Sequence, residues 1–185
     1  MTTWRTIGLS VLLVAVGSAG LADERDKKGV TISDESFRKI ASTFLNDPRQ
    51  MSAPAWSRLI LLYTMQTPNA AVVLGSEELH WAGVGGDHPY SLRLLAAYAA
   101  GNIQSQLNSG VKRNDRYSGL LTLFHVYRTL REKDKKFPKI PDVERLLELH
   151  RQDKLVTHLQ KLEEKKPTKL TPAEEQAIRK FMKGQ

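Results

Sequence analysis

Apolar residues recur along most of this chain at the spacing of an α-helix. In the first such segment they follow the i, i+3, i+4, i+7, i+8 pattern of a single buried face, at Phe37, Ile40, Ala41, Phe44 and Leu45. Equivalent segments continue to about residue 162. Ser33, Ser52 and Asp115 stand where N-caps are expected, and Gly110 stands where a helix would end.

We therefore predict an all-α fold, a compact bundle of six or seven helices. The seventh would be a terminal helix at 172–183, which a capping box with proline at its first position introduces. A short β-branched run at 71–74 is the one strand candidate. An irregular, glycine-containing loop is expected at about 75–90.

The first 22 residues have the pattern of a secretory signal peptide. Arg5 supplies a positive start, the run over 7–16 carries no charge, and Gly20 and Ala22 fit the small-residue rule for signal peptidase. A membrane-spanning helix needs ~20 apolar residues, which is longer than this run. We expect cleavage before Asp23 and an exported product, periplasmic or secreted.

The mature chain would then have a flexible polar N-terminus at 23–32 and a single domain at 33–185. The sequence contains no cysteine, so the domain has no disulfide and must be held together by packing. The same absence excludes thiol nucleophiles and zinc sites built on thiolates. We expect neither a cofactor nor a metal centre.

Positive charge is concentrated in the second half of this basic protein. Residues 110–185 hold 19 of the 28 Lys and Arg but only 11 of the 20 Asp and Glu, which accounts for the whole net charge of +8. Such asymmetry favours an anionic partner. The candidates are an anionic polymer, a membrane headgroup or an acidic protein; no specific nucleic-acid motif is present, and oligomeric state is not indicated.

Two groups of basic residues are candidate anion contacts. The first clusters at the turn before the fourth helix, at Lys112, Arg113 and Arg116. The second recurs at spacings of three and four and, at 100° per residue, falls within about 80° of one helical face. Its members are Arg151, Lys154, Lys161 and Lys165, and His158 completes the spacing between Lys154 and Lys161. The alternative interpretation is a solvated lysine-rich surface without a partner.

Carboxylates of the 75–90 loop offer a different kind of chemistry. Glycoside hydrolysis uses two carboxyl groups around the scissile bond, and Glu77 or Glu78 with Asp87 could be placed so. Glu77 and His80 also have the E-x-x-H spacing of di-iron bundles, but the motif occurs once rather than twice. No G-x-S-x-G nucleophile signature occurs.

The third predicted helix is rich in amides at Asn102, Gln104, Gln106 and Asn108. These side chains could line a polar groove or bond to buried backbone groups, and the sequence does not choose between the two. Taken together, the patterns favour an exported, non-enzymatic helical protein that binds or scaffolds an acidic partner in the cell envelope. The alternative is a cell-envelope hydrolase of muramidase type.

Overall fold

The structure of the chain is a computed structural model, which describes residues 31–74, 77–82, 90–134, 137 and 139–164. Within these ranges all regular structure is helical, which confirms the predicted all-α fold. Six α-helices and one 3₁₀ helix follow in the order α1 Asp34–Asn46, α2 Ala53–Gln66, η1 Glu77–Ala82, α3 Ser91–Ser109, α4 Arg116–Lys133, α5 Pro141–Arg151 and α6 Leu155–Glu164. The predicted signal peptide and the predicted terminal helix at 172–183 lie outside the described residues.

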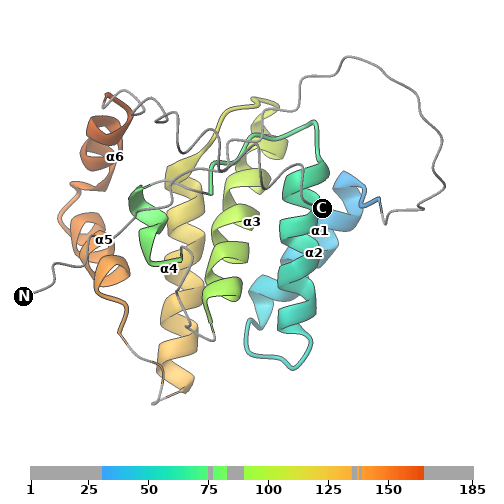
Figure 1. Cartoon of the computed structure of the whole chain (residues 1–185), viewed down its shortest axis with the longest axis horizontal. Coiled ribbons are helices and arrows are strands. Elements are labelled where there is room, and N and C mark those ends of the chain that lie inside the picture. The colour runs from blue at the N-terminus through green and yellow to red at the C-terminus, as the bar shows by residue number, and fades with distance from the viewer. Residues whose placement is uncertain (1–30, 75–76, 83–89, 135–136, 138, 165–185) are drawn as a thin grey trace, which may run out of the picture.

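Helix α3 runs through the middle of the bundle, with α4 on one side and α1 and α2 on the other (Figure 1). Every residue from Ala96 to Ile103 is buried. A helix enclosed on all sides needs apolar or small residues around its whole circumference, and four of these eight residues are alanine. Helices α5 and α6 pack on each other beyond α4.

Two glycines allow α3 and α4 to approach closely. A Cβ added to Gly101 of α3 would lie 2.6 Å from the backbone oxygen of Ser118 on α4. A Cβ added to Gly119 of α4 would lie 2.8 Å from the ring of Tyr98 on α3. Each glycine thus leaves space that the facing helix occupies, and the two helices are in contact along their backbones.

All four predicted helix ends are found in the structure, and three of the four residues have the expected capping geometry. The Ser33 side chain accepts a hydrogen bond from the Ser36 N–H, and the Asp115 side chain accepts one from the Ser118 N–H. Gly110 ends α3 with a left-handed φ of 70°. Ser52 differs, because its hydroxyl makes no capping bond to the backbone and accepts a hydrogen bond from the Trp56 indole N–H instead.

The strand considered for 71–74 does not form. Ala71 exchanges two hydrogen bonds with the side-chain amide of Gln106, its N–H donating at 2.9 Å and its carbonyl accepting at 2.8 Å. The Val73 N–H donates to the Asn114 side chain at 3.3 Å. Side-chain amides therefore take the backbone bonds that a neighbouring strand would have made, and the β-branched run reflects partial burial against the bundle.

The stretch predicted as one irregular loop contains a short helical turn. Residues Glu77–Ala82 form η1, in which Glu78 and Leu79 are buried. Residues 75–76 and 83–89, with the three closely spaced glycines, lie outside the described ranges. The helical turn is what brings Glu78 into the interior beside the start of α4.

Candidate functional site

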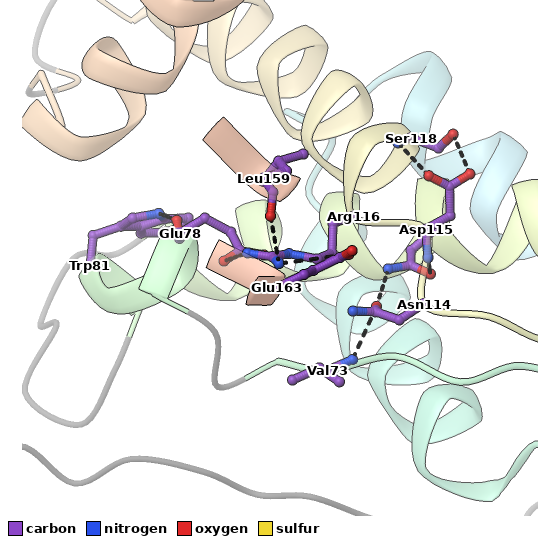
Figure 2. A network of polar contacts seen from close by, with 10 residues as sticks. Val73, Glu78, Trp81, Asn114, Asp115, Arg116, Ser118, Leu159 and Glu163 are labelled. Atoms are coloured by element: carbon purple, nitrogen blue, oxygen red, sulfur yellow. Dashed lines mark hydrogen bonds and ion pairs between the residues drawn. The ribbon is translucent and has the colours of Figure 1, made fainter. Parts of the chain in front are cut away.

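The first turn of α4 holds a buried ion pair. Both oxygens of Glu78 accept hydrogen bonds from Arg116, from Nε at 2.6 Å and from Nη2 at 2.7 Å (Figure 2). The Glu78 side chain is 0% exposed and that of Arg116 is 10% exposed. A bidentate pair of this kind is among the strongest charge-assisted contacts that a protein makes. It joins η1 to α4 across 38 residues of sequence.

Arg116 also reaches helix α6. Its Nη1 donates to the backbone oxygen of Leu159 at 3.4 Å and lies 3.9 Å from a carboxylate oxygen of Glu163. Burial lowers the pKa of the Arg116 guanidinium, but the hydrogen bonds and charge of Glu78 outweigh burial and raise that pKa above its usual value. One permanently charged side chain therefore links three elements, η1, α4 and α6.

Buried amides hold the turn that precedes Arg116. Asn102 donates to the side-chain oxygen of Asn114 at 2.7 Å, and its own oxygen accepts from Gln106 at 2.6 Å and from the Asp115 N–H at 3.0 Å. Asn102 is 0% exposed and Gln106 2% exposed. Of the two roles that the sequence left open for the amide-rich helix, these residues take the second and satisfy backbone groups.

Asp115 fixes the start of α4. Its carboxylate accepts hydrogen bonds from the Ser118 N–H, the Ser118 hydroxyl and the Ser105 hydroxyl at 3.0, 2.8 and 2.5 Å. Partial burial raises the pKa of Asp115, but these hydrogen bonds and the charge of Arg113 outweigh it, so the pKa lies below its usual value. The ionised carboxylate thus sets the direction in which Arg116 leaves the turn.

This geometry bears on the carboxylates considered for catalysis. Glu78 is closed off from solvent, and both of its oxygens are taken by Arg116. The side chain of Glu77 and the whole of Asp87 lie outside the described residues, as does the side chain of His80. Among the side chains that the structure describes, no group of three or more His, Asp or Glu could hold a metal ion.

The first group of predicted basic residues divides in two. Lys112 and Arg113 are exposed in the turn between α3 and α4. Arg116, which the sequence grouped with them, points inward to Glu78 (Figure 2). The choice could not be made from local sequence, because the carboxylate that buries Arg116 comes from a distant segment.

The second group does not lie on one helix. Arg151 is the last residue of α5 and Leu155 the first of α6. Between them Asp153 has a φ of 55°, a left-handed conformation that breaks the helical phase. Arg151, Lys154 and Lys161 are all exposed, but they belong to two helices and the turn that joins them. Lys165 lies outside the described residues.

A hollow between α4 and α5 gathers arginines that the sequence did not single out. It has a volume of about 220 Å³, and its walls are formed by Tyr127, Arg128, Arg131, Glu132, Glu144, Leu147 and Arg151. Arg128 and Arg131 are one helical turn apart on α4, and this spacing was the only feature of the local sequence that could have indicated a cluster of arginines. Their convergence with Arg151 depends on how α5 lies beside α4, and the sequence does not predict it.

Comparisons of the chain with protein-family models, with curated proteins and with solved structures find no match. No function can therefore be carried over from a relative. In the part of the chain that the structure describes, no helix has the length and apolar character needed to cross a membrane.

Proposed function

We propose that this chain is an exported, non-enzymatic binding protein of the cell envelope whose partner carries negative charge. The observation that supports the proposal is the exposure of five of the seven predicted basic residues around the α3–α4 and α5–α6 turns. These five are Lys112 and Arg113 at the first turn, Arg151 and Lys154 at the second, and Lys161 on α6. Exposed, clustered cations raise the local concentration of an anionic polymer or surface.

The two turns are held near each other by contacts around the first turn of α4. Arg116 bonds to the Leu159 carbonyl of α6. The ring of Tyr117, one residue on, lies 6.3 Å from the ring of His150 near the end of α5. These contacts place segments next to both turns against the first turn of α4, and only those cations that lie within ~10 Å of each other would escape most screening at 0.1 M salt.

The hydrolase alternative has less support. A general acid must reach the glycosidic oxygen, whereas Glu78 is sealed behind Arg116. The remaining candidates, Glu77 and Asp87, have no described side-chain geometry that would pair them. The proposal of a binding protein therefore depends on the exposed cations and is compatible with the buried state of Glu78.

Binding to heparin at increasing salt concentration tests the proposal. If four or five cations engage a polymer of duplex-like charge density, log K should fall linearly with log salt with a slope of about −4. Reversing Lys154 and Lys161 to Glu should reduce this slope by about two and weaken binding at low salt. Fold stability should change little, because both side chains are exposed.

The matched control reverses Lys39 and Arg58 to Glu, because both are exposed and lie on α1 and α2. Arg38 is unsuitable, since it donates to the Asn108 side chain and the Leu107 carbonyl and so helps to hold α1 on α3. Equal loss of binding in both double variants would mean that only diffuse net charge acts. Absence of binding at low salt would eliminate the proposed class of partner.

A further inference from the structure

The hollow between α4 and α5 contains more positive than negative side chains. Three arginines and two glutamates line it. Arg131 forms an ion pair with Glu144, and its guanidinium carbon lies 5.6 Å from the centre of the Tyr127 ring. Tyr127 in turn donates to Glu144 at 2.8 Å and accepts from the Ile140 N–H at 3.1 Å. Arg131 and Glu144 thus compensate each other as part of the wall.

The other two arginines are available to a ligand. Arg128 is exposed, and no hydrogen bond or ion pair joins it to another of the described residues. Among the described residues, Arg151 is held only by Glu148, at 3.3 Å and on the same exposed helical face. An exposed i,i+3 pair contributes only a few tenths of a kcal/mol, so a ligand can displace it. The two guanidinium groups come from different helices and lie at the same hollow.

We propose that this hollow binds the phosphate group of a small ligand. Two arginines can neutralise a dianion, and the planar guanidinium matches phosphate oxygens in a bidentate manner. A phosphomonoester carries about −1.5 to −2 charge at neutral pH, whereas a carboxylate needs only one of the two cations. At about 220 Å³ the hollow is smaller than the roughly 300–1,000 Å³ of pockets for drug-sized ligands.

Glu132 provides an internal check on the sign of the ligand charge. It is exposed and lines the same hollow, so its carboxylate repels an anion and attracts a cation. The variant Glu132→Gln should therefore bind phosphate more tightly than the parent protein. Weaker phosphate binding by this variant would contradict the proposal.

This site goes beyond the proposed binding of a polymer and can be tested separately. Inorganic phosphate is titrated into the ¹⁵N-labelled protein at pH 7.5 and low salt, with backbone amide shifts as the readout. Saturable shifts should be confined to the segments around Arg128 and Arg151. Acetate, a monoanion, should bind at least about fivefold more weakly. Equal affinity for acetate, or no saturable shift at millimolar phosphate, would overturn the proposal.

Three single variants locate the site. Arg128→Gln and Arg151→Gln should each weaken phosphate binding by at least about fivefold. Arg145→Gln is the matched control, because Arg145 is exposed on the same helix as Arg151 but does not line the hollow. The amide spectra also show whether each variant is folded. An equal loss in Arg145→Gln would show that the protein has no specific site there.

Vesicles distinguish two sources of the phosphate group. Phosphatidylcholine vesicles with added phosphatidic acid carry a phosphomonoester headgroup. If Arg128→Gln and Arg151→Gln reduce vesicle binding while Arg145→Gln does not, the group belongs to a lipid. If the protein binds inorganic phosphate, with loss in Arg128→Gln and Arg151→Gln but not in Arg145→Gln, and does not bind the vesicles, the ligand is a free phosphate compound. Either result requires the two arginines to act together.

Discussion

The ion pair between Glu78 and Arg116 fixes how the neighbouring elements pack against the start of α4. Removing a carboxylate and a guanidinium from water costs several kcal/mol for each ion, and the attraction between them repays this cost only when the geometry is good. Here both carboxylate oxygens are bonded and the guanidinium has further acceptors on α6. The pair therefore serves to fix η1 and α6 relative to α4 more than to increase stability.

Replacing one partner should be far more harmful than replacing both. Glu78→Gln leaves the charge of Arg116 buried with only the exposed carboxylate of Glu163, 3.9 Å away, as a counter-ion. Breaking a buried pair by removing one partner typically costs about 3–5 kcal/mol. The double variant Glu78→Leu/Arg116→Leu should regain most of that loss. Urea unfolding at 25 °C measures both. Glu163→Gln, whose side chain is 65% exposed, should stay within about 0.5 kcal/mol and serves as the control.

Tyr63 connects stability to alkaline pH. Its hydroxyl donates to Asp34 at 2.6 Å, and burial together with this hydrogen bond raises the pKa of Tyr63 from 10.0 to about 12. The folded state thus holds the phenol proton more tightly than the unfolded state does. The resulting stability is complete below pH 10 and is lost as the pH rises from 10 through 12.

The variant Tyr63→Phe should therefore be less stable than the parent at pH 8, by about 1 kcal/mol for the lost hydrogen bond. The difference between the two proteins should shrink between pH 10 and 12. Burial also raises the pKa of Tyr127, and the hydrogen bond to Asp134 raises that of Tyr90. Both proteins contain these two tyrosines, so both should lose stability at alkaline pH for this second reason, and only the difference between them reports on Tyr63. Thermal unfolding across this pH range gives the comparison; a constant difference would contradict the assignment to Tyr63.

At the scale of helices, the backbone contact between α3 and α4 organises the core. Buried leucines and aromatic residues fill the rest of the bundle. Where the two central helices meet, Gly101 faces the Thr122 side chain and the Ser118 carbonyl of α4, and Gly119 faces the ring and carbonyl of Tyr98 on α3. Protein interiors are packed as densely as organic crystals, so such a contact has no space for a methyl group. The separation of α3 and α4 is consequently set at Gly101 and Gly119.

The variant Gly101→Ala tests this contact, because helix propensity and close packing predict opposite changes in stability. In a helix with a free surface the change would stabilise by about 1 kcal/mol, because alanine has the higher helix propensity. Here the added methyl meets the Ser118 carbonyl, so we expect a loss of about 1–3 kcal/mol from overpacking. A rise in melting temperature would contradict the close approach. Gly110→Ala, which meets no atom within 4 Å, should cost about 1–2 kcal/mol from its left-handed backbone alone.

Local patterns predicted the helices well and their long-range pairings poorly. Ser33, Asp115 and Gly110 act on their own neighbours, so spacing alone located these helix ends. Arg116 looked like a surface cation because Glu78, its partner, is far away in sequence. The break at Asp153 was hidden for a related reason, since a left-handed φ at a non-glycine residue has little sequence signal.

At the scale of the whole molecule, the hydrophobic core and the net positive charge are distributed differently along the chain. The core is continuous from α1 to α6, whereas the net charge of +8 belongs to residues 110–185. Many of those cations lie on the described surface of α4, α5 and the neighbouring turns, and others lie beyond residue 164. The fold thus determines where the exposed cations stand, whereas the buried Arg116 is a cation whose charge the fold uses, through its pair with Glu78.

The proposed export of the chain can be tested by a simple measurement. If the signal peptide is removed as we propose, the protein recovered from the envelope fraction of its native cells should begin at Asp23. The predicted site is Gly20-Leu21-Ala22. Intact-mass spectrometry distinguishes this product from the full chain. A full-length species in the membrane fraction would instead identify the first 22 residues as a retained anchor.

The paired bonds between Gln106 and Ala71 have a consequence for evolutionary divergence. One side chain both donates to the carbonyl and accepts from the N–H of the same residue. Glutamate would lose the donor, asparagine is a methylene too short, and leucine would lose both bonds. A surface lysine can be exchanged for arginine or moved by a turn, but this amide has no equivalent replacement. Distant descendants of this fold should therefore retain glutamine at this position long after their surface charges have changed.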